Sequence, residues 1–286
     1  MIISIASGKG GTGKTLVATS LAHALKGVVP VTLLDCDVEE PNDHLYMRAR
    51  LVDTQPVTIS VPLVDESKCI YCGMCHDVCA FNAIAVMGSA VLVFKELCHG
   101  CGACTRLCPV GAISETPHEI GVVEEGAADR IRFFDGVLTI GQPMAPPIIR
   151  QVKTHVGSEG VTIIDASPGT SCPVVEAVKG SDFCILVTEP TPFGLNDLKL
   201  AVETMRELGL PHGAIINRVG VGDARTESYC NAEGIPVLMT IPLDERIARS
   251  YSRGVPLLEA LPEYRQRFLD LYDRIAELVN ERSSRS

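Results

Sequence analysis

The segment GKGGTGKT at residues 8–15 has the residue types and spacing of a loop that holds a phosphate chain. It satisfies the pattern GxxxxGK[ST], follows an apolar segment at 2–7 and precedes a segment of helical periodicity at 15–26. In such a loop, backbone N–H groups surround the phosphates, Lys14 reaches the β and γ oxygens, and the Thr15 hydroxyl ligates Mg²⁺. We therefore expect ATP or ADP, with Mg²⁺, to bind at Gly8, Lys9, Gly10, Gly11, Thr12, Gly13, Lys14 and Thr15.

Eight of the twelve cysteines form two copies of one pattern, CxxCGxCxxxCxxxAI, at residues 69–84 and 98–113. Each copy resembles the C-x₂-C-x₂-C-x₃-C run of bacterial two-cluster ferredoxins, although the usual Cys-Pro is Cys79-Ala80 in the first copy. In those ferredoxins the fourth cysteine of each run ligates the other cluster. The resemblance thus implies two [4Fe–4S] clusters, one held by Cys69, Cys72, Cys75 and Cys108, the other by Cys98, Cys101, Cys104 and Cys79.

A pair of zinc sites is the alternative use of these cysteines. Zinc usually takes two CxxC pairs per ion and does not need two symmetric runs of four, so clusters are favoured. His76 and His99 lie among the cysteines and are expected to be surface residues or neighbours of the ligands. The repeat therefore predicts iron–sulfur chemistry.

The composition narrows the classes of function. The chain has 286 residues, 46% hydrophobic and 21% charged, with a formal net charge of −10 and no Lys/Arg run, which opposes binding to nucleic acid or to an anionic membrane. Neither a signal peptide nor an apolar run of about 18–20 residues is recognisable. We expect a cytoplasmic protein without stable membrane insertion. Cytosolic thiols stay reduced, so metal ligation explains the cysteines better than disulfides.

Apolar strands alternate with segments of helix length outside the cysteine block. Strands are expected at 2–7, 31–37, 161–168, from about 182, at 213–219 and at 236–242, and helices at 15–26, 146–156, 193–209, 224–234 and 263–282. Three short strands, IGVVEE, RIRFF and GVLTIG, are expected within 120–141. This order predicts an α/β fold with a doubly wound, mostly parallel sheet at 1–62 and 117–286, and an inserted small ferredoxin-like α+β domain at 63–116. The helix at 263–282 is expected to pack on the core.

The loop KGGTGKT resembles the deviant phosphate loop of the MinD/Mrp/ParA group of dimeric ATPases, whose superfamily includes the nitrogenase iron protein and cobyrinic acid a,c-diamide synthase. In that group the extra lysine, here Lys9, reaches across the dimer interface to the partner's nucleotide. The resemblance covers nearly the whole chain outside the cysteine block. It implies a homodimer, or a heterodimer with a paralogous ATPase.

Two aspartate segments resemble the switches of that group. In LLDCDVEEPN, Asp35 and Asp37 match the first switch, so Asp37 would orient or deprotonate the attacking water and Asn42 would be a switch residue. In IIDASPG, Asp165 would lie near Mg²⁺ through water, and the turn at Pro168 and Gly169 would sense the γ-phosphate. Both segments end predicted strands, where open α/β sheets place their ligands. For Asp35 a solvated or capping acid at the strand end remains equally open.

Weaker signals lie elsewhere. Asn217 and Pro242 resemble the group's adenine-binding elements. Cys172 follows Asp165 at a spacing similar to that of a cluster-bridging cysteine in the nitrogenase iron protein, but no second such cysteine is evident and a structural role is favoured. Cys36, Cys184 and Cys230 are expected to be core residues.

The motifs together favour an ATPase, with Lys9, Lys14, Asp37 and Asp165 as catalytic residues, that couples nucleotide state to electron transfer or metallocofactor assembly with a partner protein. One alternative is a positioning or scaffolding ATPase like MinD or ParA with structural or regulatory clusters. Another is an iron–sulfur carrier of the Mrp type, although no CxxC follows Cys108. An amide-forming ligase related to cobyrinic acid a,c-diamide synthase is the least favoured.

Overall fold

One large sheet organises the protein. The computed structural model describes residues 1–284, and within them nine strands form a sheet in the order β11-β10-β9-β1-β8-β2-β7-β6-β3. The first seven in this order are parallel to one another, as the alternation of strands and helices predicts. They are β11 (Val237–Pro242), β10 (His212–Val219), β9 (Phe183–Thr188), β1 (Ile2–Ala6), β8 (Val161–Ala166), β2 (Val31–Cys36) and β7 (Ile131–Leu138).

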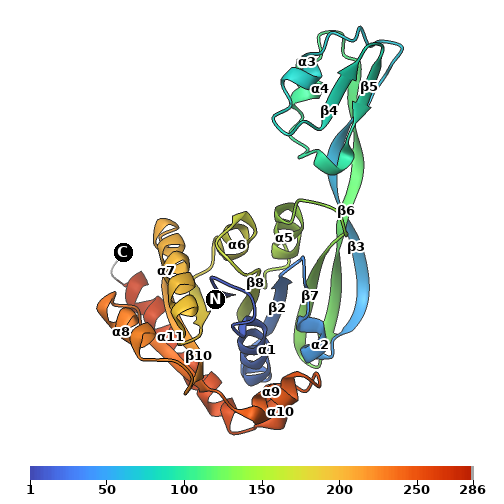
Figure 1. Ribbon diagram of the computed structural model, residues 1–286. Coiled ribbons are helices and arrows are strands. Elements are labelled where there is room, and N and C mark those ends of the chain that lie inside the picture. Colours follow the sequence, from blue (N-terminus) through green and yellow to red (C-terminus); the bar gives the residue numbers. More distant parts are fainter. Residues whose placement is uncertain (285–286) are drawn as a thin grey trace.

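Helices cover both faces of this sheet (Figure 1). One apolar cluster joins the sheet to α1 (Lys14–Leu25), α9 (Glu245–Tyr251), α10 (Leu257–Ala260) and α11 (Tyr264–Ser283). The other joins it to α5 (Pro146–Lys153), α6 (Cys172–Val178), α7 (Pro192–Glu207) and α8 (Arg225–Ala232). Neighbouring residues of one strand enter opposite clusters, as Leu33 and Leu34 do in β2. The doubly wound α/β architecture is therefore confirmed.

The C-terminal helix α11 packs on the core, as predicted. Phe268, Leu271 and Ile275 lie on its buried face, in the same cluster as α1. No helix in the described part of the chain is long and apolar enough to cross a membrane.

Two strands at one edge form a long arm. β3 (Arg50–Val64) pairs antiparallel with β6 (Ile113–Ala128), from Arg50 opposite Ala127 to Val64 opposite Ile113. β6 pairs with β7 only from Gly121, opposite Leu138, to Ala128. Residues 113–120 of β6 therefore continue past the end of β7, which corresponds to roughly 25 Å of strand. Because β7 is parallel to β2 and runs antiparallel to β6, this arm extends beyond the carboxyl ends of the parallel strands (Figure 1).

The cysteine block lies at the far end of the arm (Figure 1). It contains an antiparallel hairpin of β4 (Ile84–Met87) and β5 (Ala90–Val93), the short helices α3 (Met74–Asp77) and α4 (Ala103–Leu107), and the 3₁₀ turn η1 (Lys95–Leu97). We call residues 65–112 the insert. The boundaries expected at 62/63 and 116/117 fall inside the paired strands of the arm, close to where the insert begins and ends.

The expectation of three short strands within 120–141 is wrong. IGVVEE belongs to the long strand β6, and RIRFF continues without a turn into GVL as the single strand β7. Asp135 and Gly136 suggest a turn in the sequence, but Gly136 is a packing position, because an added Cβ would lie 2.7 Å from Val38 Cγ1 and 2.8 Å from Val152 Cγ2. The arm strand β3 and the short helix α2 (Asp43–Met47) were not predicted at all.

Candidate functional site

The glycine-rich loop connects β1 to α1, as its sequence predicts. Gly13 caps the helix with φ of 101°, a conformation that favours glycine, and an added Cβ there would lie 2.4 Å from Asn217 Nδ2. Asn217, at the end of β10, donates from Nδ2 to the carbonyl of Thr12 at 2.7 Å. The buried side-chain amide of Asn217 thus holds the loop in place, and the twelve-residue helix α1 begins directly after the loop. This is the backbone arrangement that receives phosphate oxygens.

Three aspartates lie side by side at the carboxyl ends of neighbouring strands. Asp35 of β2 is in register with Asp165 of β8 on one side and with Asp135 of β7 on the other. Thr15 Oγ1 donates to Asp165 Oδ2 at 2.8 Å, which joins the two groups expected at Mg²⁺. Burial raises the pKa of Asp165 to about 8, against the opposing effect of Lys14. A divalent cation at this point would restore the charged carboxylate, so the donor set suits Mg²⁺.

Asp37 and Asp35 have different surroundings. Burial raises the pKa of Asp37 to about 7, again opposed by Lys14, and its side chain lines the nucleotide-sized cavity described below. Asp35 is fully buried, and its carboxylate accepts backbone N–H groups from Asp37, Asn42 and Asp43, each at 3.0 Å. The structure therefore places Asp35 as the anchor of the loop after β2, which is the capping role left open by the sequence.

A cavity of about 310 Å³ opens above the glycine-rich loop, a size suited to a nucleotide. It brings together Lys14, Thr15 and Asp37 with the more weakly indicated Asn217 and Pro242. Its remaining lining residues include Gly10, Gly11, Gly13, Glu40, Asn42, Pro168, Arg218, Leu243, Asp244, Ile247, Ala248 and Tyr251. Gly169, next to Pro168, has φ of 102° and donates its N–H to the carbonyl of Ser7 at 2.8 Å, so the turn after β8 is tied to the start of the loop.

Lys9 and Arg218 share a carboxylate that sequence reasoning missed. Lys9 Nζ lies 3.6 Å from Glu189 Oε2, and Arg218 Nη1 lies 2.9 Å from Glu189 Oε1. Arg218 also donates from Nη2 to the carbonyl of Gly11 at 3.0 Å. Glu189 is almost fully buried at the end of β9. The sequence offered one indication of this site, because Glu189 directly follows an apolar strand, but no motif links Glu189 to Lys9.

The eight repeated cysteines surround two small cavities in the insert, each of about 20 Å³. One contains Cys79, Cys98, Cys101 and Cys104 and borders Ser60, Pro62 and Glu115 of the arm; we call it the proximal cavity. The other contains Cys69, Cys72, Cys75 and Cys108 and borders Val64 and Ile113, farther along the arm; we call it the distal cavity. Each cavity thus joins three cysteines of one repeat with the fourth cysteine of the other, which is the crossed grouping that the ferredoxin resemblance implies.

Backbone N–H groups point at the sulfurs in a repeated pattern. Tyr71 N–H donates to Cys69 Sγ at 3.4 Å, and at the equivalent place in the second repeat Gly100 N–H donates to Cys98 Sγ at 3.4 Å. Both donors have positive φ, 55° for Tyr71 and 64° for Gly100. The fourth cysteines behave alike, since Ala83 donates to Cys79 Sγ and Ala112 to Cys108 Sγ at 3.3 and 3.2 Å. Four thiols around a cavity, with N–H donors on two of the sulfurs, fit the ligand chemistry of an iron–sulfur cluster.

A site for a single metal ion requires three or more ligating side chains close to one point. Among residues 1–284 no group of three or more His, Cys, Asp and Glu side chains is placed to hold one. His76 Nδ1 lies 2.9 Å from the carbonyl oxygen of Ile84, and His99 stacks on Phe81 with ring centroids 3.6 Å apart.

The other four cysteines lie outside these cavities. Cys36, Cys184 and Cys230 are buried, as expected for core residues. Cys172 is exposed in the first turn of α6, outside both cavities.

Comparisons with known proteins agree with the nucleotide-binding part of this geometry. Residues 3–257 match the family model described as CobQ/CobB/MinD/ParA nucleotide binding domain. The uncharacterized protein MJ0579 of Methanocaldococcus jannaschii is 30% identical over 283 residues, which cover 98% of this chain and 97% of that protein. An iron–sulfur cluster carrier protein of Pyrococcus horikoshii is 24% identical over 98% of this chain and 86% of its own length.

Among solved structures, the septum site-determining protein MinD of Pyrococcus horikoshii, in complex with Mg-ADP, has a TM-score of 0.60 and 23% identity, covering 97% of this chain and 96% of that one. At that identity the likeness shows a shared fold. The family model, which spans most of the chain, and the full-length relative at 30% identity show more. The chain belongs to the CobQ/CobB/MinD/ParA family of nucleotide-binding proteins.

Proposed function

We propose that this protein is a dimeric, Mg²⁺-dependent ATPase whose nucleotide state controls electron transfer through two [4Fe–4S] clusters in the insert. The observation that carries the proposal is the crossed grouping of eight cysteines at the end of an arm that begins in the ATPase sheet. A bound [4Fe–4S] cluster supplies one-electron transfer. Cys69, Cys72, Cys75 and Cys108 would hold one cluster, and Cys98, Cys101, Cys104 and Cys79 the other.

The nucleotide site assigns a task to each side chain. The N–H groups of residues 8–13 bind the phosphates, Lys14 neutralises the β and γ oxygens, and Thr15 with Asp165 holds Mg²⁺. Asp37 lies in the same cavity, and a pKa of about 7 suits a carboxylate that takes a proton from the attacking water. Asn217 positions the loop through the carbonyl of Thr12, and Pro242 lines the expected adenine end.

Lys9 supports the dimer in this proposal. In the single subunit it is paired with Glu189 and a third of its side chain is exposed, so a second subunit can approach it. A second copy of this chain, or a paralogue, would then receive Lys9 at its own nucleotide. Coupling follows from linkage, because a nucleotide that binds the closed dimer more tightly shifts the population toward it.

The carrier function stays a second candidate because of one observation. The relative from Pyrococcus horikoshii is named as an iron–sulfur cluster carrier and spans nearly the whole chain. A carrier must release its cluster, whereas an electron-transfer protein keeps both. Incubating the reconstituted protein with an apo-ferredoxin and following cluster transfer by circular dichroism separates the two functions.

Anaerobic EPR of the dithionite-reduced protein, with and without MgATP, tests the main proposal. We expect two interacting paramagnetic centres whose spectrum or potential changes on adding MgATP. The Lys14→Ala variant should keep the centres and lose the change, since Lys14 serves the phosphates. Clusters whose spectrum and potential do not respond to nucleotide would overturn the coupling. A protein that binds no iron after anaerobic reconstitution with iron and sulfide would overturn the cluster assignment.

A further inference from the structure

We propose that in the ATP-bound dimer each insert docks against the other subunit through Phe81, Phe94 and Leu97, which we call the proximal patch. The docking partner is therefore a second copy of this chain. The inference rests on the proposed function, because it requires the dimer across the nucleotide face. It adds a contact, made by the insert, that the nucleotide site does not provide.

The direction of the arm is the first argument. The nucleotide cavity lies at the carboxyl ends of β1, β2, β8 and β10, since its lining residues follow those strands. The arm leaves the sheet in the same direction, because β6 passes Leu138 at the carboxyl end of β7 and continues to the insert. A subunit that packs on the nucleotide face therefore enters the space beside the arm (Figure 1).

The length of the arm is the second argument. Residues 113–120 carry the insert roughly 25 Å past the sheet. A compact core of about 200 residues has a radius of gyration of about 17 Å and is thus roughly 40 Å across, and an insert of about 50 residues is roughly 25 Å across. A partner core on the nucleotide face fills the first 40 Å or so beyond the sheet edge. The insert, at about 25–50 Å, must then lie alongside it.

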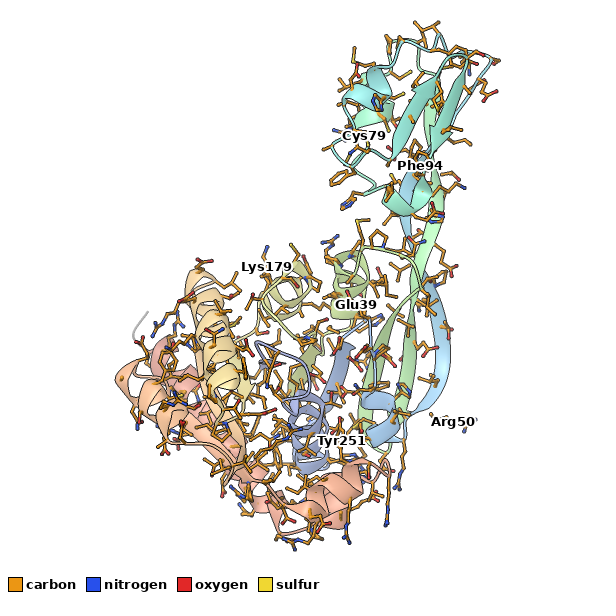
Figure 2. All side chains as sticks on the ribbon, in the orientation of Figure 1. Glu39, Arg50, Cys79, Phe94, Lys179 and Tyr251 are labelled. Carbon is orange, nitrogen blue, oxygen red and sulfur yellow. The ribbon has the colours of Figure 1, made fainter. Side chains whose placement is uncertain are left out.

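The chemistry of the insert is the third argument. Phe81, Phe94 and Leu97 are 39%, 42% and 48% exposed, which is costly for large apolar side chains in a small domain. Phe81 lines the proximal cavity, which borders the arm, and stacks on His99. Figure 2 shows Phe94 at the base of the insert, where the insert meets the arm, and Cys79 on the side that overhangs the ATPase core.

The proximal patch is held firmly in place. The N–H of Phe94 donates to the carbonyl of Ala83 at 2.8 Å, and Leu97 N–H donates to the carbonyl of Phe94 at 3.1 Å. These bonds fix the backbone at Phe94 and Leu97, and the stacking on His99 orders the Phe81 ring. Aromatic side chains are typical anchors of protein interfaces. In a two-fold dimer the same contact forms twice, once for each insert.

The nucleotide face carries matching apolar side chains. Ile140 follows β7 and is fully exposed, Phe193 follows β9 at the start of α7 with 79% exposure, and Leu243 follows β11 with 56%. All three stand at the carboxyl edge, which the partner would cover. Exposed apolar side chains therefore lie both on the nucleotide face and in the proximal patch.

Site-specific photo-crosslinking tests the docking. The photoreactive p-benzoylphenylalanine is placed at Phe94 and, as a matched control, at Met87, which is 65% exposed in the turn between β4 and β5. With the cluster-loaded protein and a non-hydrolysable ATP analogue with Mg²⁺, we expect the Phe94 probe to give at least five times more covalent dimer than the Met87 probe. Mass spectrometry should map its crosslinks to residues 1–49 or 129–284 of the other subunit.

A second variant pair guards against misfolding at Phe94. Leu97→Asp should weaken the nucleotide-dependent dimer about tenfold, because each insert loses one half-buried apolar contact, whereas Met87→Asp should change it less than twofold. If a dimer forms but both probes crosslink equally and both variants behave alike, the docking is wrong and the proposed function stands. If light scattering finds no nucleotide-dependent dimer in the wild type, the dimer and the docking both fall.

Discussion

Replacing Glu189 by Gln should strengthen the nucleotide-dependent dimer. Glu189 holds Lys9 at 3.6 Å within its own subunit. In the proposed dimer Lys9 would have to leave this carboxylate before it could reach the partner's nucleotide. The Glu189→Gln substitution would keep the shape of the side chain and a hydrogen bond to Arg218 while removing the charge. Arg218 would stay attached to the loop through the carbonyl of Gly11.

The size of the effect follows from the geometry of the pair. Two unit charges 3.6 Å apart attract by about 5 kcal/mol at an effective dielectric constant of about 20. Because a third of the Lys9 side chain is exposed, desolvation and solvent screening reduce the net gain to about 1 kcal/mol. That is about fivefold for each subunit. A homodimer releases two lysines, so its dissociation constant should fall about thirtyfold.

Sedimentation velocity over a concentration series, with a non-hydrolysable ATP analogue and Mg²⁺, measures this constant. Glu207→Gln, on the exposed end of α7, is the matched control for loss of one negative charge. Binding of ADP to the monomer should be nearly the same in all three proteins. An unchanged or weaker dimer in Glu189→Gln would refute the reasoning, since the pair would then not restrain Lys9.

Three further outcomes follow from the structure. Burial, followed by the charges of Asp35 and Glu124, raises the pKa of Asp135 to about 9, compared with about 4 in an unfolded chain. The contribution of Asp135 to stability is therefore complete below about pH 4 and is lost as pH rises toward 9. Asp135→Asn should flatten the fall in Tm between about pH 6 and 8.5, and an equal fall in the variant and the wild type would contradict this. Gly13→Ala should cost about 1–3 kcal/mol in urea unfolding through strain, plus the 2.4 Å clash with Asn217, and should abolish ADP binding in calorimetry. Gly27→Ala has similar strain in open space and should keep ADP binding. Cys79→Ala should lose about half of the bound iron, whereas Cys172→Ala should lose none, as measured by iron and sulfide analysis. An equal loss of iron in the two variants would argue against the grouping of cysteines at the proximal cavity.

The sequence predicts local motifs well because each is defined by neighbours along the chain. The loop at 8–15 needs only its glycines, its lysine and the helix behind it. Asp165 is recognisable because it ends an apolar strand. The row of Asp35, Asp135 and Asp165 was not predictable in the same way, because strand register places residues together that lie a hundred or more positions apart.

The arm was missed because the first half of β3 carries no periodic signal. Its first seven residues are exposed on both faces, so apolar and polar side chains need not alternate. Pro56 and Pro62 also argue against a strand, yet both are tolerated because β3 lies at the edge of the sheet. Pairing with β6 alone defines this strand, and a partner about sixty residues away is not visible in the local sequence.

Lys9 and the proximal patch both lack, within a single subunit, the contacts that the proposed dimer would give them. Lys9 lies in the phosphate loop but is paired with Glu189, and the proximal patch leaves three large apolar side chains in water. In the proposed dimer a second core would cover the carboxyl edge and offer phosphates to Lys9 and apolar surface to the proximal patch. Both groups would then have a lower free energy in contact with that core than in the single subunit. Both contacts lie in the same direction from the sheet and would form in one step. A nucleotide that favours this step would therefore change the surroundings of the proximal cavity as well as its own, which would give a physical route from nucleotide state to the cysteine sites.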